Sequence, residues 1–282
     1  MKIKISADST CDLSPELIER YHIGITPLYI IRGEETLRDG IDVHPQELYD
    51  YANATGKLCK TAAVNVSDYL AYFAACREEY DAVIHFTISS DMSGCYQNAC
   101  IAAKEFTNVY PVDSRNLSTG IGHLVLNAAE MAEQGMDAAD IAAALEKKRE
   151  KLDVSFVIDT LEYLKRGGRC SPSAAFFGTM LKIKPVLHVD SEGRLIARSK
   201  VRGRMQALRA IAMKFGELEA DKDQMIFISH GDCEKDAMVV KETLVKEFGC
   251  DPERIILSAV GPVIGSHSGP GTVALFFYGT EK

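Results

Sequence analysis

The first half of the chain alternates apolar runs of strand length with segments that have the apolar spacing of helices. Strands are expected at Lys2–Ala7, Ala82–Ile88 and Val109–Val112, and helices at Gly94–Phe106 and Thr119–Glu133. Strands that alternate with helices in this way normally pair in parallel. The order of these elements therefore predicts the α/β class, with a parallel sheet in the first half.

Local signals predict further elements between these. Ser14 precedes Pro15 as the start of a helix, since proline is favoured at the first helical position. Ile23–Ile31 is expected to form one strand, followed by a turn and a short return strand. Ser67 is expected to cap a helix that extends through Cys76.

The pattern changes near Asp153, where strand candidates begin to outnumber helices. The chain has 282 residues, more than is usual for one domain, so we expect an N-terminal α/β domain at 1–153 and a C-terminal α/β domain at 154–282. One large α/β domain is the alternative. No low-complexity linker is present, so the domains should touch, and the cleft between them is the expected ligand site. The strand candidates of the second half are Ser155–Ile158, Lys184–Val189, Leu195–Lys200, Met225–His230, Ile255–Ala259 and Val273–Tyr278.

Composition limits the classes of function. A net charge of −8 disfavours nucleic-acid binding, which needs a broad cationic face. No stretch approaches about 18 consecutive apolar residues and no signal-peptide pattern opens the chain, so we expect a soluble cytoplasmic protein with at most transient membrane contact. Eight cysteines without a CxxC pair indicate reduced thiols, and seven dispersed histidines indicate that no metal cofactor is bound.

Three strands of the first half run into loops rich in serine, threonine and aspartate: Ala7–Asp12, Ser89–Gly94 and Asp113–Gly120. In a parallel sheet such loops gather at the carboxyl edge, where hydroxyl groups and helix amino termini favour a carboxylate or a phosphate. Each of these side chains could instead simply cap a helix. Ser93 and Gly94 are the strongest candidates, because a ligand oxygen can approach both the hydroxyl and the backbone amides there.

Two glycine-containing segments of the second half carry basic or imidazole side chains. Lys165–Arg169 places three cations around two glycines, which suits either an anion site or a basic turn in solvent. P-loop spacing is absent, so nucleotide binding is not predicted. Gly261–Thr272 is expected to be a rigid loop that brings His267 close to a ligand, although a lone histidine is often structural. Ser93 and His267 could form a nucleophilic pair, but no GxSxG motif supports one.

A local basic stretch interrupts this acidic chain. Six basic residues and no acidic one lie in the segment that follows Gly193 and ends with Arg209. Such a stretch docks an acidic partner or contacts a phosphate, or else it is a solvated hairpin and helix start. If it is a docking surface, Lys200, Arg202 and Arg204 are the candidates for contacting the partner.

Together these segments resemble the DegV family over the whole chain. The resemblance implies a parallel-sheet N-terminal domain, a mixed-sheet C-terminal domain and one long-chain fatty acid held between them. The motifs that carry it are Asp8–Leu13, Thr61, Ser90–Gln97, Val112–Arg115, Ser118–Gly120, Leu164–Arg169, Lys184–Pro185 and Gly261–Gly271.

The resemblance also implies roles for individual residues. Thr61 and Ser93, the latter followed by Gly94, match the hydroxyl groups that bind the fatty-acid carboxylate in the family. His267 matches the histidine near the carboxylate, and Arg169 matches the arginine after the glycine pair. The acyl tail would run into the C-terminal domain.

The function implied by the resemblance is that of a carrier and not of an enzyme. The protein would present the carboxylate to a separate ATP-dependent kinase and would need no cofactor of its own. A hydrolase or phosphotransferase that uses Ser93 or His267 as nucleophile is the alternative, and a fatty-acid-responsive regulatory module is a third. Four apolar residues after Ser171 could line the tail or belong to the ordinary core: Phe176, Phe177, Met180 and Leu181.

Overall fold

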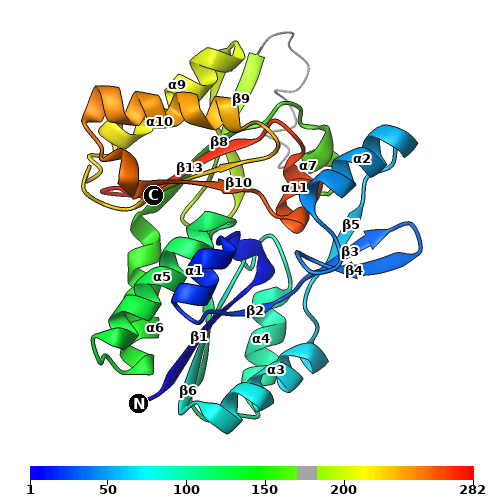
Figure 1. The fold of residues 1–282 in the computed structure, drawn as a ribbon, viewed down its shortest axis with the longest axis vertical. Coiled ribbons are helices and arrows are strands. Elements are labelled where there is room, and N and C mark those ends of the chain that lie inside the picture. Colours follow the sequence, from blue (N-terminus) through cyan, green and yellow to red (C-terminus); the bar gives the residue numbers. More distant parts are fainter. Residues whose placement is uncertain (170–182) are drawn as a thin grey trace.

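The computed structural model describes residues 1–169 and 183–282. The chain forms two domains, one N-terminal and one C-terminal (Figure 1). The predicted fold class is confirmed, because the first domain contains a four-stranded parallel sheet and the second a six-stranded mixed sheet. The four apolar residues proposed to line the acyl tail lie outside the described residues.

The parallel sheet has the strand order β2-β1-β6-β7. Every residue of β6 is buried, as expected for an inner strand of a parallel sheet that is covered on both faces. The strands are β1 (Ile3–Asp8), β2 (Gly24–Thr26), β6 (Ala82–Thr87) and β7 (Val109–Asp113). The helices around them are α1 (Pro15–Arg20), α3 (Val66–Glu79), α4 (Cys95–Ala103), α5 (Thr119–Glu133) and α6 (Ala138–Lys148).

Two local predictions for this domain are wrong. Ile23–Ile31 forms two strands, because Pro27 cannot donate a backbone hydrogen bond and separates β2 from the next strand, which belongs to another sheet. Helix α3 is capped by Asn65, whose Oδ1 accepts a hydrogen bond from the N–H of Asp68 (2.9 Å), and not by Ser67. Asparagine and serine are equally good caps, so composition alone does not separate the two positions.

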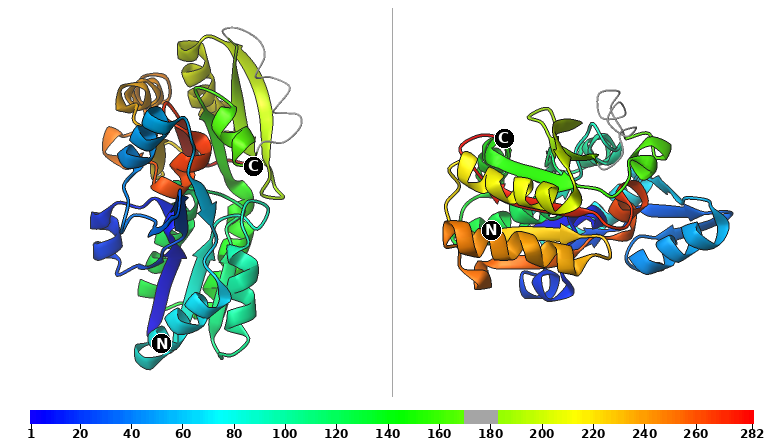
Figure 2. Two further views of the ribbon diagram at one scale, coloured as in Figure 1. Left: turned by 90° about the vertical axis from the view of Figure 1, so that its right-hand side faces the viewer. Right: turned by 90° about the horizontal axis from the view of Figure 1, so that it is seen from above.

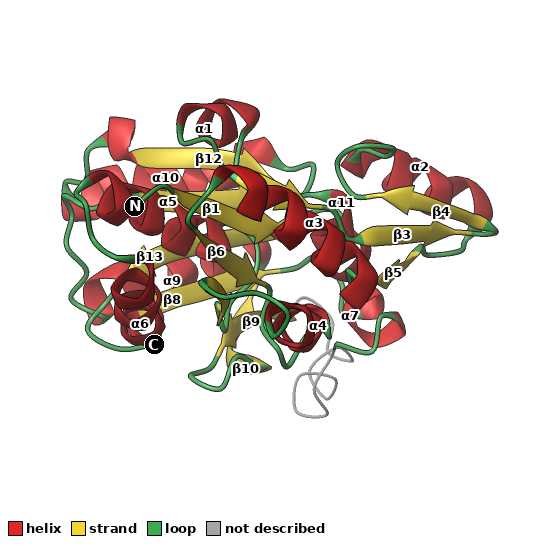
Figure 3. Cartoon of the chain, turned by 90° about the horizontal axis from the view of Figure 1, so that it is seen from below, coloured by secondary structure: helices red, strands yellow, loops and turns green. Residues whose placement is uncertain are grey.

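A small antiparallel sheet extends from one end of the molecule beside α2 (Figure 3). Its central strand follows Pro27, and its edge strand β5 carries Thr61, one of the predicted site residues. The sheet therefore places Thr61 at the border of the N-terminal domain. Its elements are β3 (Tyr29–Arg32), β4 (Glu35–Arg38), β5 (Lys60–Ala62) and α2 (Pro45–Thr55).

The C-terminal sheet has the order β10-β9-β8-β13-β11-β12, and all six predicted strands are present. Only β11 and β12 pair in parallel. Helices α9 and α10 cover the face of this sheet that points away from the N-terminal domain (Figures 1 and 2). The elements are β8 (Leu152–Val157), α7 (Glu162–Arg166), β9 (Ile183–Val189), β10 (Leu195–Arg202), α9 (Arg204–Glu217), β11 (Ile226–His230), α10 (Glu234–Phe248), β12 (Ile255–Ala259), α11 (Pro262–Ser268) and β13 (Val273–Tyr278).

The segment predicted as a rigid loop contains the short helix α11. Pro262 occupies the first helical position, where a missing N–H costs nothing. Gly269 follows the last helical residue with φ +76°, a conformation that favours glycine and ends the helix. His267 is therefore held on a helix and not on a loop.

Helix α5 joins the two domains into one core. It contacts β1 and β6 on one side and β8, β11 and β13 on the other. Because both sides are covered, ten of its fifteen residues are buried, His123 included. With α10, α5 is the longest described helix at 15 residues, and no described helix is both long and apolar enough to cross a membrane.

Candidate functional site

The carboxyl ends of β1, β6 and β7 meet at one edge of the parallel sheet, as predicted for their three hydroxyl-rich loops. The carboxylate of Asp8 accepts hydrogen bonds from the N–H groups of Thr10 (3.1 Å) and Ile88 (2.8 Å), which ties the first loop to the second. The hydroxyl of Ser90 donates to Asp113 (2.6 Å), which ties the second loop to the third. These bonds fix the three loops relative to one another.

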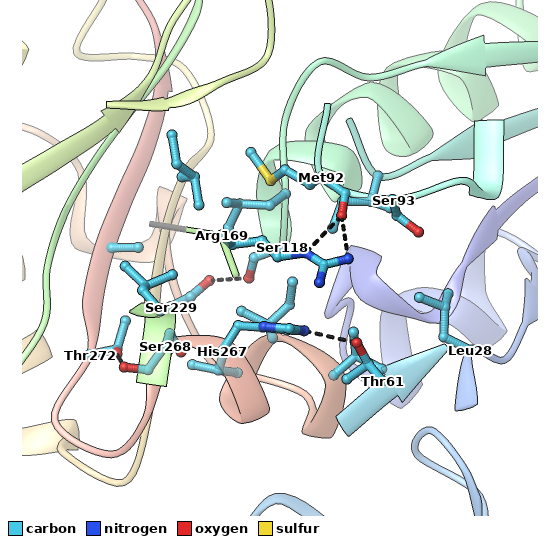
Figure 4. Close-up of a pocket in the computed structure, with 18 of the residues that line it drawn as sticks. Leu28, Thr61, Met92, Ser93, Ser118, Arg169, Ser229, His267, Ser268 and Thr272 are labelled. Atoms are coloured by element: carbon cyan, nitrogen blue, oxygen red, sulfur yellow. Dashed lines mark hydrogen bonds between the residues drawn. The ribbon is translucent and has the colours of Figure 1, made fainter. Parts of the chain in front are cut away.

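A cavity lies between this edge and the C-terminal domain (Figure 4). It measures about 120 Å³ and is mostly apolar. A wider, more open recess of about 780 Å³ shares Met92, Ser93, Gly94, Arg169 and Leu195 with it, so the two hollows adjoin at these residues. The apolar lining of the cavity comes from both domains and includes Leu28, Ile88, Leu117, Phe156, Leu164, Leu195, Val260, Val263, Ile264 and Ala274.

Thr61 and His267 meet at the wall of this cavity although they are 206 residues apart. Strand β5 carries Thr61 and helix α11 carries His267, and Thr61 Oγ1 lies 2.8 Å from His267 Nε2 (Figure 4). Burial, assisted by the nearby charge of Arg169, lowers the pKa of His267 to about 4. The imidazole is thus neutral near pH 7, and its Nε2 can donate or accept according to the tautomer.

Ser93 and Gly94 form the start of α4 and also line the cavity. The hydroxyl oxygen of Ser93 accepts a hydrogen bond from the N–H of Cys95 (3.4 Å), the first residue of α4, while Gly94 occupies the N-cap position. Among the described residues, a β-carbon at Gly94 would meet only the side-chain amide of Asn98, at 4.0 Å. A ligand oxygen therefore has room beside the backbone of Gly94.

Arg169 connects the segment after α7 to the Ser93 loop. Its Nε and Nη2 donate to the carbonyl oxygen of Met92 (3.1 and 3.0 Å), and its Nη1 donates to the carbonyl oxygen of Gly167 (2.8 Å). Arg169 lines both the cavity and the open recess, so it lies where the two meet. It supplies a positive charge close to His267 at that position.

Ser93 and His267 do not form a nucleophile–base pair. Within residues 1–169 and 183–282, the side chain of Ser93 bonds to Cys95 and that of His267 bonds to Thr61, and no hydrogen bond joins the two. The same residues contain no group of three or more histidine, cysteine or acidic side chains that could hold a metal ion. The described residues therefore leave Ser93 without a base to activate it.

Asp39 supports the site but was not predicted from the sequence. Its Oδ1 accepts a hydrogen bond from the N–H of Val263 (3.2 Å) at the start of α11, and its Oδ2 accepts from the hydroxyl of Ser9 (2.6 Å). Burial raises the pKa of this carboxyl to about 6. Asp39 thus anchors the helix that carries His267, and no motif in the sequence marks that role.

A second unpredicted feature is a chain of hydroxyl groups across the domain interface. Ser118 Oγ donates to the buried carboxylate of Asp12 (2.6 Å) and lies 3.2 Å from Ser229 Oγ. Thr119 Oγ1 lies 2.8 Å from the same oxygen of Ser229. The loop after β7 was predicted to be near the ligand, but its partner Ser229 comes from β11 and carries no sequence signal.

The basic stretch is partly neutralised. Arg204 donates to Asp236 (2.6 Å) and to the carbonyl oxygen of Gly271 (2.7 Å), so its guanidinium group serves the fold of the C-terminal domain. Arg198 forms an ion pair with buried Asp153 (2.6 Å). Arg202, at the end of β10, is exposed and forms no ion pair with the described residues, which leaves it available to a partner.

Comparisons with known proteins agree with this architecture. A family model described as "Uncharacterised protein, DegV family" matches residues 2–280. A Thermotoga maritima protein named "Fatty acid-binding protein" is 34% identical over 281 residues, covering 97% of this chain and 96% of its own. The Bacillus subtilis protein named "Protein DegV" is 31% identical over 280 residues, covering 98% of both chains.

Solved structures of DegV family proteins have the same architecture. A fatty-acid-binding DegV family protein from Thermus thermophilus superposes with a TM-score of 0.93 at 33% identity, covering 99% of this chain and 100% of its own. The structure of DegV from Bacillus subtilis, described as a fatty acid binding protein, superposes with a TM-score of 0.87 at 28% identity, covering 99% of both chains.

Proposed function

The chain belongs to the DegV family, and on that premise we propose that it is a carrier that binds one long-chain fatty acid between its domains, taking the domain boundary between residues 153 and 154. The observation that carries this proposal is the Thr61–His267 contact at the wall of an apolar cavity formed by both domains. An apolar cavity with a few convergent polar groups is the usual form of a small-molecule site.

The carboxylate would bind where Thr61, Ser93 and His267 converge. A buried carboxylate is costly unless it is hydrogen-bonded and preferably paired with a positive charge. The two hydroxyl groups and the Nε2–H tautomer of His267 can each donate to it, and Arg169 supplies the nearby charge. The hydrogen bond between Thr61 and His267 would then open to admit the carboxylate between them.

The acyl chain would occupy the apolar part of the cavity. Burial of each CH₂ group gains roughly 0.8 kcal/mol, so a chain of about 16 carbons gains more than about 10 kcal/mol before the costs of association and ordering. Apolar side chains from both domains line this space, among them Leu28, Phe156 and Ala274. The tail therefore supplies the affinity, and the polar residues fix the position of the carboxylate.

We further propose that the bound carboxylate is presented to a separate ATP-dependent kinase, which would form an acyl phosphate in the cytoplasm. The open recess beside Ser93, Gly94 and Arg169 would provide the access route to the carboxylate. Arg202, together with Lys200, would contact the kinase, whereas Arg204 contributes through the fold. Any contact with a membrane would be transient.

Native mass spectrometry before and after delipidation tests the carrier proposal. The full chain is expected to take up a long-chain fatty acid in a one-to-one complex. Thr61→Val, which removes one hydroxyl group, is expected to weaken binding by about tenfold, since a hydrogen bond to a charged group contributes about 1.5–3 kcal/mol. Thr55→Val is the matched control, because the hydroxyl of Thr55 bonds locally, to the backbone of Tyr51 and Lys57 at the end of α2. A delipidated protein that takes up no fatty acid would overturn the proposal.

A further inference from the structure

A second cavity lies between the two domains, at the other end of the elements that border the first. Helix α5 contributes Ser118, at its start, to the acyl cavity and Glu130, three turns further on, to the second cavity. At 1.5 Å per residue these two residues are about 18 Å apart along the helix. Likewise β13 contributes Ala274 to the first cavity and Tyr278 to the second. The second cavity measures about 230 Å³ and shares no lining residue with the first.

Lys148 brings an unpaired positive charge to this second cavity. Its side chain is half-buried, and its ammonium group donates to the amide oxygen of Asn127 and lies 4.7 Å from the ring centre of Tyr278. It forms no ion pair with any residue in 1–169 or 183–282. Burial lowers the pKa of Lys148, and the more distant carboxylate of Glu130 offsets this only in part. A desolvated ammonium group without a counter-ion favours the binding of an anion.

Tyr278 adds a hydrogen-bond donor that is not used within the described residues. Its hydroxyl oxygen is buried and has no hydrogen-bond partner there. Burial raises the pKa of Tyr278, so the phenol stays protonated and can donate. A buried hydroxyl group without a partner is costly, and a ligand oxygen at this position would remove that cost.

Arg254 completes a positively charged environment. It ends the short helix η4 (Pro252–Arg254), lines the cavity, and donates to the backbone carbonyl of Asp223 (2.6 Å) without forming an ion pair in the described part of the chain. His123 adds no charge, because burial lowers its pKa to about 4. Two cations therefore face one carboxylate, that of the exposed Glu130.

We propose that this cavity binds a phosphate group, from inorganic phosphate or a phosphomonoester, with Lys148 and Arg254 pairing its charge and Tyr278 donating a hydrogen bond. The three groups come from α6, η4 and β13, so they approach from different directions, which a tetrahedral oxyanion satisfies better than a planar carboxylate. Because α6 belongs to the N-terminal domain and the other two elements to the C-terminal domain, the anion would bridge the domains. This role is separate from fatty-acid binding.

Calorimetric titration of the delipidated full chain with inorganic phosphate, at constant ionic strength, tests the proposal. The wild type is expected to bind one phosphate. Lys148→Met and Tyr278→Phe are each expected to weaken binding by about tenfold, as loss of one hydrogen bond to a charged group predicts. Lys147→Met is the matched control, since Lys147 is the exposed neighbour on α6 and does not line the cavity. It removes the same charge and is expected to bind as the wild type does.

The outcomes distinguish a specific binding site from general electrostatic attraction. Absence of phosphate binding by the wild type, equal weakening by Lys147→Met and Lys148→Met, or unchanged binding by Tyr278→Phe would each overturn the proposal. Tyr278→Phe alone decides the matter if Lys148→Met fails to fold. Methyl phosphate identifies the source within the class, because tighter binding than that of inorganic phosphate indicates a phosphomonoester. Uptake of fatty acid by the same variants shows separately that the acyl site is intact.

Discussion

The α-carbon of Gly167 lies directly against the imidazole of His267, and a β-carbon built on it would be 2.2 Å from His267 Nδ1. No side chain fits at that distance, so Gly167→Ala must displace the ring and break its contact with Thr61. Overpacking of this kind costs about 1–3 kcal/mol, and we expect fatty-acid affinity to fall by about tenfold. Displacement of a fluorescent fatty acid measures the change.

A double-mutant cycle controls for indirect effects of the alanine. Once His267→Ala has removed the ring, the clash is gone, and Gly167→Ala is expected to cause little further loss of affinity. An equally large effect of Gly167→Ala in both backgrounds would show that the glycine acts on something other than His267.

Fatty-acid binding is expected to take up protons. The pKa of His267 is about 4 in the free protein, and a carboxylate bound beside Nε2 would raise it, because an anion stabilises the imidazolium. A group whose pKa rises on binding gains protons, so affinity increases as the pH falls. The uptake should be larger at about pH 6 than at about pH 8, because pH 6 is closer to the ordinary pKa of histidine.

Calorimetry in buffers of different ionisation enthalpy measures this proton uptake. His267→Asn keeps a hydrogen-bonding side chain but does not titrate, and it is expected to show none. Proton release on binding to the wild type would contradict the assignment of His267 to the carboxylate site.

Asp39 is expected to make the fold less stable as the pH rises. Burial raises its pKa from 3.8 to about 6, so between these values the folded state holds a proton that the unfolded state has lost. The stabilising contribution is therefore complete below about pH 4 and is lost as the pH rises through about 6. Asp39→Asn keeps an acceptor for Val263 N–H, and relative to the wild type it should gain up to about 2 kcal/mol between about pH 4 and pH 7. Urea unfolding across this range measures the difference.

Asp42 provides a control, because its effect on stability changes with pH in the opposite direction. It is hydrogen-bonded to Arg38, which lowers its pKa to about 2, so its contribution is present above the ordinary pKa and is lost in acid. Asp42→Asn should therefore lose stability relative to the wild type as the pH rises from about 2 to about 4, and only slightly, because exposed pairs are screened by solvent. The same trend for both variants would refute the account of Asp39.

The architecture could be predicted from the sequence wherever one local signal dominates. The sequence predicts the strand Ala82–Thr87 and the helix Thr119–Glu133 closely, because the hydrophobic pattern of each segment is long and uninterrupted. The glycine and serine content of Pro262–Ser268 is typical of loops and predicts one, whereas the segment forms a short helix. Packing against both domains favours the helix, together with Pro262 at its start and Gly269 after its end.

The site could be predicted only in part, because its residues come from separate elements. The loop composition and the helical pattern after it predict Ser93 at the start of a helix near a ligand. No local feature of the sequence indicates that Thr61 and His267 lie together, and only the resemblance to the DegV family predicts that both are near the carboxylate. Asp39 and Gly167 act through tertiary contacts with α11, at Val263 and His267 respectively. Contacts of that kind produce no periodic pattern in the sequence, so a single sequence does not predict them.

Arg202 offers a test of kinase docking that is separate from lipid binding. It is exposed at the end of β10 and does not line the acyl cavity, so Arg202→Ala should leave fatty-acid affinity unchanged. Docking charges mainly speed association, so the rate of acyl-phosphate formation at limiting carrier should fall by about tenfold and become less sensitive to salt. Arg20, exposed at the end of α1 and outside the basic stretch, is the matched control, and Arg20→Ala should keep the wild-type rate. Equal losses in both variants would mean that the kinase responds to overall charge, in which case the basic stretch is an ordinary solvated surface.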